Sequence, residues 1–300
     1  MRIFLTGASG WIGSATTREL VAAGHEVLGL ARTERAAAAV AQAGGTPVPG
    51  TLADLDLLAE QAAAADGVVH LAFRHDVAFA GDFQAAVDSD RQAIEAFGDA
   101  LHGTDRPLLI ASGTVGLADG RVGTEQDRPD VSAGPRADNA AATLALAERG
   151  VRSIVVRFAP TVHGAGGDPG FVTVLAQVAR GTGIAGFVGE GRNRWPAVHR
   201  DDAAALVRRA IESAPAGSVL HATAETGVAT RDIAQALGDA LHLPVRSVAQ
   251  EQAAEHFGFL AGFFAADAPA SSDETRRLLG WNPTGATLLE DIAAGHYPGT

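Results

Sequence analysis

A short apolar run followed at once by three regularly spaced glycines constrains this chain more than any other feature. The run is Ile3–Leu5, and Gly7, Gly10 and Gly13 follow it before a helical pattern over Ser14–Ala23. In a strand–turn–helix unit, the first glycine permits a tight turn, the second lets backbone approach a pyrophosphate, and the third packs helix on strand. The segment therefore predicts a dinucleotide-binding turn, whose residues are Gly7, Ser9, Gly10, Trp11, Ile12 and Gly13.

Strand-like and helix-like segments alternate through the first half of the chain. The strand-like runs are Ile3–Leu5, Glu26–Leu30, Val68–Leu71, Leu108–Ala111 and Ser153–Arg157. The stretches with helical spacing are Ser14–Ala23, Glu34–Ala43, Asp56–Ala65, Asp82–Leu101 and Asp138–Arg149. This βαβ alternation predicts an α/β Rossmann fold, which is a doubly wound parallel sheet with helices on both faces.

After Arg157 the pattern changes to glycine-rich loops and then to helices. His163–Gly170 and Gly181–Arg194 are glycine-rich, Asp201–Ser213 favours a helix, and Ser218–Ala222 favours a strand that returns to the sheet. We therefore expect a smaller, mainly helical C-terminal substrate lobe. The expected boundaries are residues 1–164 and 198–224 for the dinucleotide-binding domain, and residues 165–197 and 225–300 for the lobe.

The end of the second expected strand indicates which dinucleotide binds. NAD-binding proteins carry an Asp or Glu about 20 residues after the glycines, and it holds the ribose 2′-hydroxyl. This chain has Leu30-Ala31-Arg32-Thr33 there. A guanidinium forms charge-assisted hydrogen bonds with a 2′-phosphate, which a carboxylate would repel. Arg32 therefore favours NADP(H) as the cofactor; the alternative is a solvated surface charge.

Composition disfavours several classes of protein and site. The chain has no cysteine, so we expect neither disulfides nor a metal site. Its net charge of −12 disfavours nucleic acid as a partner. No apolar run approaches the roughly 18 residues of a membrane span, and the glycine turn begins too early for a signal peptide to precede it. We expect a cytoplasmic protein that acts on a small-molecule substrate, with no membrane partner.

Further short motifs accompany the glycine turn. They are Asp54-Leu55, His70-Leu71-Ala72, Ala111-Ser112-Gly113-Thr114, Arg157, Val198-His199-Arg200-Asp201-Asp202 and Leu279-Gly280-Trp281-Asn282-Pro283. Together with the turn they resemble the extended short-chain dehydrogenase/reductase superfamily, the group of NAD-dependent epimerases and dehydratases. The resemblance implies that Asp54 and Leu55 lie under the adenine, and that Leu71 and Ala72 wall the cofactor.

The catalytic part of this resemblance is altered. The resemblance implies that Ser112 or Thr114 hydrogen-bonds the reacting oxygen. The superfamily's Tyr-x-x-x-Lys signature is absent, because the chain has no lysine and its single tyrosine is Tyr297. One register places the pair on Ser132 and Arg136, and a second places the tyrosine position on Arg136 itself. The chain therefore resembles an atypical member whose catalytic pair is replaced.

An arginine at this position changes the chemistry that the site can perform. It can bind the nicotinamide ribose or stabilise an oxyanion, but it cannot readily donate a proton because its pKa lies above about 12. The proton donor would then be His75, His163, His199, Asp138 or solvent. We expect His199 and Asp138 to serve mainly at helix starts. His75, His163 and Trp195 are the expected residues of the substrate cleft.

Three functions fit these features. The one we favour is an NADPH-dependent reductase that transfers hydride to a small, fairly apolar C=O, C=N or conjugated C=C substrate, because the last two need little acid assistance. The second is a non-catalytic NADP(H)-binding redox sensor. The third is an epimerase or dehydratase, which relies more on acid–base groups. The Ala-rich faces of Asp82–Leu101 and Asp138–Arg149 allow either a homodimer interface or packing on the sheet.

Overall fold

A seven-stranded parallel sheet is the centre of the computed structural model, which describes residues 1–118, 120–128 and 135–298. The strand order is β3-β2-β1-β4-β5-β6-β10. The bounds are β1 Arg2–Thr6, β2 Glu26–Ala31, β3 Thr46–Pro49, β4 Gly67–His70, β5 Pro107–Gly113, β6 Arg152–Phe158 and β10 Ser218–Ala222. With β1 flanked by β2 and β4, this is the doubly wound arrangement, and the predicted fold class is confirmed.

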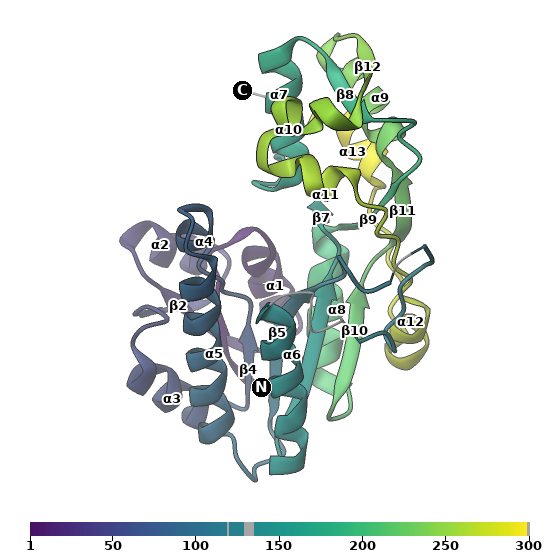
Figure 1. Ribbon diagram of the computed structural model, residues 1–300. Helices are drawn as coiled ribbons and strands as arrows, with labels where there is room; N and C mark the ends of the chain where they lie inside the picture. Colours follow the sequence, from purple (N-terminus) through teal and green to yellow (C-terminus); the bar gives the residue numbers. More distant parts are fainter. Residues whose placement is uncertain (119, 129–134, 299–300) are drawn as a thin grey trace.

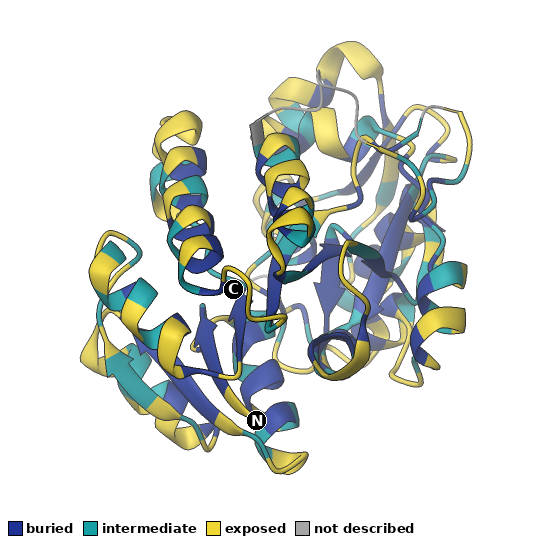
Figure 2. Cartoon of the chain, turned by 90° about the horizontal axis from the view of Figure 1, so that it is seen from below, coloured by how far each residue is buried: buried dark blue, intermediate teal, exposed yellow. Residues whose placement is uncertain are grey.

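Helices cover both faces of this sheet. Strands β1, β4 and β6 are buried on both faces, which explains why they are continuous apolar runs in the sequence. One face packs on α1 (Trp11–Ala22), α2 (Glu34–Gln42) and α8 (Arg200–Ser213). The other packs on α3 (Leu55–Ala64), α5 (Phe83–Ala100) and α6 (Pro135–Ala145). Figure 2 shows the buried strands in dark blue between helices whose outer residues are exposed.

A smaller lobe lies beyond the carboxyl ends of the strands (Figure 1). Its strands are β7 Thr161–His163, β8 Ala185–Val188, β9 Arg194–His199, β11 Glu225–Ala229 and β12 Val245–Val248. They form one sheet of order β11-β9-β7 and a pair β12-β8. The helices are α7 Phe171–Thr182, α9 Thr230–Leu241, α10 Ala253–Phe257, α11 Ala261–Ala265 and α13 Leu288–Ala293. Because β7 follows β6 after two residues, the chain enters the lobe at the sheet's carboxyl edge.

The segment around α12 (Asp273–Leu279) belongs to the large sheet rather than to the lobe. Leu279 and Trp281 share the buried cluster of α1 and α8, and the Trp281 Nε1 donates to the Asp202 carbonyl at 3.0 Å. The expected boundary at residue 225 does not anticipate this return, because the contacts are long-range and leave no local pattern.

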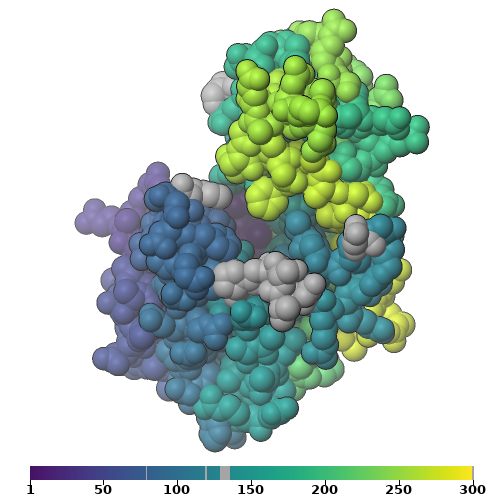
Figure 3. All heavy atoms as spheres, viewed as in Figure 1, coloured from purple at the N-terminus to yellow at the C-terminus, as the bar shows by residue number. Residues whose placement is uncertain are grey.

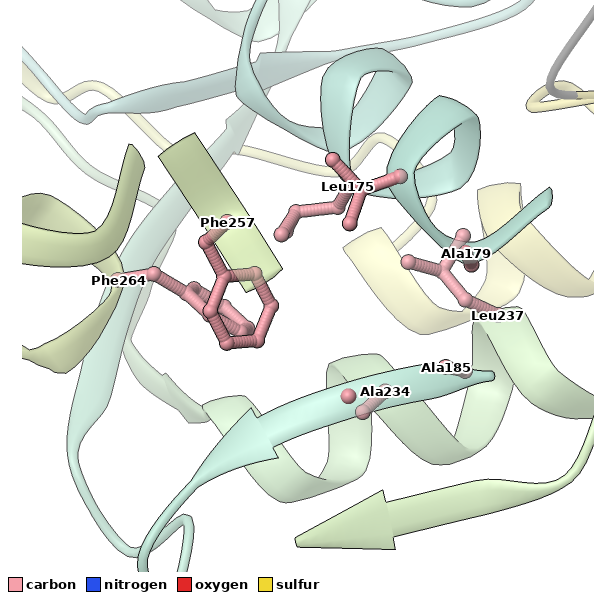
Figure 4. Close-up of a pocket in the computed structure, with 9 residues that line it drawn as sticks. Leu175, Ala179, Ala185, Ala234, Leu237, Phe257 and Phe264 are labelled. Atoms are coloured by element: carbon pink, nitrogen blue, oxygen red, sulfur yellow. The ribbon is translucent and has the colours of Figure 1, made fainter. Parts of the chain in front are cut away.

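The lobe has an apolar core of its own. Figure 4 shows Leu175 of α7 and Leu237 of α9 near the rings of Phe257 and Phe264, which come from α10 and α11. These apolar side chains line a cavity of about 10 Å³. A space of that size holds one water molecule at most, so it is a packing gap and not a ligand site.

Candidate active site

Two glycines of the turn between β1 and α1 are packed too closely to carry a side chain. Gly7 has φ +73°, and a Cβ there would lie 2.8 Å from the Ala72 nitrogen. A Cβ on Gly13 would overlap the Gly7 carbonyl oxygen. Gly10 is the N-cap of α1 and offers no side-chain cap, so the first amides of the helix remain available to an anion. Ser9 and Gly10 are exposed, and the turn therefore fits the pyrophosphate of a dinucleotide.

Trp11, inside the glycine turn, connects the turn to the lobe. Its indole Nε1 donates to the Val162 carbonyl of β7 at 2.7 Å. The guanidinium of Arg200 lies 4.0 Å from the centre of the indole ring. Ile12 is half-buried against the cluster beneath α1. The side chains of Trp11 and Ile12 thus anchor the turn, while their backbone amides face the helix N-terminus.

The residues expected around the adenosine lie at the ends of β2 and β3. Arg32 directly follows β2 and is exposed, and its Nη1 donates to the Asp76 Oδ2 at 3.0 Å. The Asp54 Oδ2 accepts from the Thr51 amide at 2.7 Å and from its hydroxyl at 2.9 Å. An open cavity lies directly beside Asp54, and its lining residues are Pro49, Ala53, Asp54, Leu55, Asp56 and Leu57.

The expected wall of the cofactor follows β4. The Leu71 amide donates to the Thr6 carbonyl at 3.2 Å, and the Ala72 amide donates to the Thr6 Oγ1 at 3.3 Å. Both residues are half-buried. Their backbone therefore lies against the glycine turn, since Gly7 contacts this same segment.

A buried chain of polar side chains, which no local sequence pattern indicates, runs from β1 to α6. The Thr6 hydroxyl lies 2.6 Å from the His70 Nδ1, and the His70 Nε2 lies 3.1 Å from the Asp90 Oδ1. The other oxygen of Asp90 accepts from the Asn139 Nδ2 at 2.8 Å. Burial raises the pKa of Asp90, but the bonds from His70 and Asn139 and the charge of Arg136 outweigh it, so the net pKa is lowered. Asp90 is therefore the anionic centre of this chain.

Arg136 lies in the first turn of α6, close to that anionic centre. Its guanidinium stands 4.2 Å from the centre of the Phe73 ring. Burial lowers the pKa of Arg136, while the charge of Asp90 opposes that shift. His75 contacts Phe73 edge to face at 5.1 Å, and burial, followed by the charge of Arg136, lowers its pKa. Ser132, the other residue of the first register, lies outside the described residues.

The two hydroxyl side chains at the end of β5, Ser112 and Thr114, differ in their exposure to solvent. Ser112 is half-buried beside the exposed Gly113. Thr114 is 2% exposed, and its buried Oγ1 has no hydrogen-bond partner among the described residues. Ser112 is thus the hydroxyl that is open to a ligand at this strand end.

His163 and Trp195 both lie inside the lobe, away from any open surface. The His163 Nδ1 lies 2.6 Å from the Asp291 Oδ2, and the His163 side chain is completely buried. Burial lowers the pKa of His163, but Glu225 and Asp291 outweigh it, so the net pKa is raised. Trp195 is 2% exposed and its Nε1 donates to the Phe263 carbonyl at 3.1 Å. In the described arrangement both residues join parts of the lobe instead of facing a cleft.

His199 and Asp138 occupy helix starts, as expected. His199 is the N-cap of α8, and its Nδ1 accepts from the Asp201 amide at 3.2 Å. Asp138 lies in the first turn of α6, where its charge favours the helix dipole.

The glycine turn follows the carboxyl end of β1, and Ser112 lies at the carboxyl end of β5. Arg136 lies at the start of α6, which follows β5 in the chain. Figure 3 shows a hollow between this domain and the lobe, with N-terminal residues in purple at its floor.

Among the described residues, no group of three or more His, Cys, Asp or Glu could hold a metal ion. In the same residues, no helix combines the length and the apolar character needed to cross a membrane.

Comparison with known proteins agrees with this architecture. The model of the NAD dependent epimerase/dehydratase family matches residues 3–222. A Schizosaccharomyces pombe protein described as uncharacterized is 48% identical over 298 residues, covering 99% of this chain and all of its own. A Saccharomyces cerevisiae protein, also described as uncharacterized, is 42% identical over 299 residues, which cover 99% of both chains.

Solved structures show the same fold at much lower identity. A dTDP-glucose 4,6-dehydratase from Streptomyces venezuelae, with NAD bound, has a TM-score of 0.76. It is 20% identical, and the match covers 99% of this chain and 96% of the dehydratase chain. At this identity the likeness concerns the fold alone.

Proposed function

Because the chain belongs to the NAD-dependent epimerase/dehydratase family, we propose that it is an NADPH-dependent reductase of the short-chain dehydrogenase/reductase type. The substrate is a small, fairly apolar molecule with a C=O, C=N or conjugated C=C bond. The protein acts in the cytoplasm, and the outer faces of α5 and α6 form a homodimer interface.

Arg136, in the first turn of α6, is the observation that favours a reductase over the other functions. The family resemblance puts a tyrosine and a lysine at this site, whereas the chain has no lysine and its single Tyr297 is 2% exposed in the lobe core. Arg136 holds its proton throughout the neutral range. Epimerases and dehydratases need groups that give and take protons, so this site disfavours them. Stabilising a developing negative charge, in contrast, suits a guanidinium.

The residues at the carboxyl edge fit the adenosine and pyrophosphate parts of NADPH. The uncapped first turn of α1 would hold the pyrophosphate, Arg32 would hold the 2′-phosphate, and Asp54 with Leu55 would contact the adenine. When bound, NADPH supplies the hydride that a reduction requires.

We place the oxygen of a C=O or conjugated C=C substrate between Ser112 and Arg136. There the Ser112 hydroxyl would donate a hydrogen bond to it, and the Arg136 guanidinium would stabilise the negative charge that develops on this oxygen as hydride arrives at carbon. The proton would then come from solvent or from His75. A C=N substrate that reacts as a cationic iminium needs no proton and develops no negative charge, so enones and ketones are the suitable probes of Arg136, and cyclic imines test hydride transfer without its help.

The test is NADPH oxidation, followed by absorbance, with a panel of cyclic imines, enones and apolar ketones. We expect turnover with at least one class. We further expect Arg136→Ala to lower kcat for ketones or enones by about 10²-fold, as the loss of an oxyanion donor does, while the Kd for NADPH stays unchanged. Arg149→Ala is the matched control, because it removes an arginine beyond the other end of α6, at an exposed ion pair with Asp99, and it should retain full activity.

Two outcomes would contradict the reductase. Tight NADPH binding without turnover of any substrate class would favour the redox sensor. Turnover of a substrate without net NADPH consumption would favour the epimerase or dehydratase.

A further inference from the structure

An ion pair at the edge of the cofactor site joins two residues that are far apart in the sequence. The Arg32 Nη1 donates to the Asp76 Oδ2 at 3.0 Å, across a separation of 44 residues. Asp76 lies in the first turn of the short helix α4 (His75–Phe79), which follows β4. Both side chains are open to solvent, with 64% of Arg32 and 47% of Asp76 exposed. A ligand can therefore reach either partner.

The strand order shows what this ion pair spans. Strand β1 pairs with β2 on one side and with β4 on the other, and all three are parallel. Arg32 leaves the carboxyl end of β2, and Asp76 follows the carboxyl end of β4. The ion pair therefore crosses the carboxyl end of β1, where the glycine turn begins. A dinucleotide whose pyrophosphate rests on that turn has its adenosine half on the β2 side, next to Arg32.

A second arginine faces the same carboxylate. The Arg74 Nε lies 3.9 Å from the Asp76 Oδ1. The hydrogen bond from Arg32 lowers the pKa of Asp76, so the carboxylate is ionised throughout the neutral range. Two guanidinium groups thus face one carboxylate. Proteins also bind phosphate groups between arginines in this way.

The carboxylate of Asp76 occupies the Nη1 of Arg32, and a 2′-phosphate that binds the same guanidinium would compete with it. An exposed ion pair of this kind is weak, at roughly 0.2–1 kcal/mol, so a phosphate can displace Asp76. A phosphate that carries nearly two negative charges makes the stronger charge-assisted bonds, but the displaced carboxylate remains close and repels it. NADH has no 2′-phosphate, so its binding neither requires the displacement of Asp76 nor suffers the repulsion by its carboxylate.

We propose that Asp76 sets the cofactor preference of this protein by competing with the 2′-phosphate of NADP(H) for Arg32 and Arg74. This inference deepens the proposed function and rests on its NADP(H) site. Asp76 weakens NADPH binding selectively. The preference for NADPH is accordingly smaller than Arg32 alone would produce.

The test compares Kd values of NADPH and NADH for the wild-type protein and for Asp76→Asn. We expect the ratio of the NADH Kd to the NADPH Kd to rise about two- to five-fold in Asp76→Asn, which is the loss of one exposed ion pair. When the same Asp76→Asn change is made in an Arg32→Ala protein, this gain should become smaller, because only the contact with Arg74 and the charge repulsion remain. The small probe 2′,5′-ADP should bind Asp76→Asn more tightly by the same factor, whereas 5′-ADP should not.

The control is Asp239→Asn in α9, which removes the same charge from an exposed aspartate that likewise accepts a side-chain hydrogen bond, from Gln235. It should leave both Kd values unchanged. An unchanged ratio in Asp76→Asn, or an equal change for both cofactors, would overturn the inference. Failure of the proposed function would be recognised in the wild-type protein itself, which would then prefer NADH or would turn over no substrate.

Discussion

At the scale of single residues, Asp90 is the side chain on which most neighbours depend. It is 6% exposed and accepts hydrogen bonds from His70 and Asn139. It also supplies the negative charge nearest to the candidate catalytic Arg136. A buried carboxylate in such a chain is costly to remove, because its donors lose a charged acceptor and stay out of water.

We expect Asp90→Asn to lower the free energy of unfolding by about 1–3 kcal/mol at neutral pH. The folded protein holds the pKa of Asp90 below its unfolded value, so this stabilisation is present above about pH 4 and is lost as the pH falls through the folded pKa. Urea denaturation over a pH series measures it. The difference between wild type and variant should therefore shrink in acid.

Asp88→Asn is the control for this variant. Asp88 lies on the same helix but is exposed, and it accepts only from Gln84, at 2.8 Å, among the described residues. Its replacement should change stability by less than about 0.5 kcal/mol. An equal loss in both variants, or a difference that does not change in acid, would argue against the buried chain.

At the scale of elements, the contact between α1 and β1 depends on the absence of side chains at Gly7 and Gly13. The helix begins directly above the turn, and an added Cβ on Gly13 would overlap the Gly7 carbonyl oxygen. That oxygen also accepts the Gly10 amide at 2.9 Å. Helix, turn and strand therefore form one packed unit that cannot widen at a single position.

We expect Gly13→Ala to push α1 away from the turn and to weaken NADPH binding by at least about tenfold. Overpacking of this kind also costs about 1–3 kcal/mol of stability. Isothermal titration with NADPH and a thermal melt measure the two effects.

Gly181→Ala in α7 supplies the comparison, because a Cβ there meets no atom within 4 Å. It should keep NADPH affinity and gain up to about 1 kcal/mol from helix propensity. If Gly13→Ala bound NADPH as well as this control, the turn would not be the pyrophosphate site.

At the scale of the whole molecule, a cluster of titratable side chains around the buried His163 joins distant parts of the chain. His163 of β7 lies 2.6 Å from Asp291 of α13 and 3.7 Å from Glu225 of β11. His199 and His296 each approach Asp291 to 4.0 Å. The cluster ties the C-terminal helix to two strands that precede it by more than 60 residues.

We expect His163→Gln to destabilise the protein more at about pH 6 than at about pH 9. The two carboxylates hold the pKa of His163 above its unfolded value. Its stabilisation is therefore fully present below about pH 6.5 and is lost as the pH rises through the folded pKa. Denaturation curves at both pH values measure it, with Asp239→Asn as a pH-independent control. A constant difference between wild type and His163→Gln would show that the histidine does not titrate in this range.

The parts that could be predicted from the sequence are those governed by neighbours along the chain. The glycine turn follows from backbone geometry, the buried strands from their continuous apolar runs, and the fold class from their alternation with helices. The position of Arg32 at the end of β2 also follows from spacing alone.

The tertiary structure decided which distant side chains meet. Asp76 reaches Arg32 only because parallel β2 and β4 flank β1, and Asp90 reaches His70 only because α5 packs beneath β4. His163, an expected substrate residue, is instead buried against Asp291 across 128 positions of the sequence. No periodicity or spacing records such a pairing, because it depends on how whole elements pack. The sequence by itself therefore determined the fold and the glycine turn, and only the packed structure decided the partners of the charged groups around them.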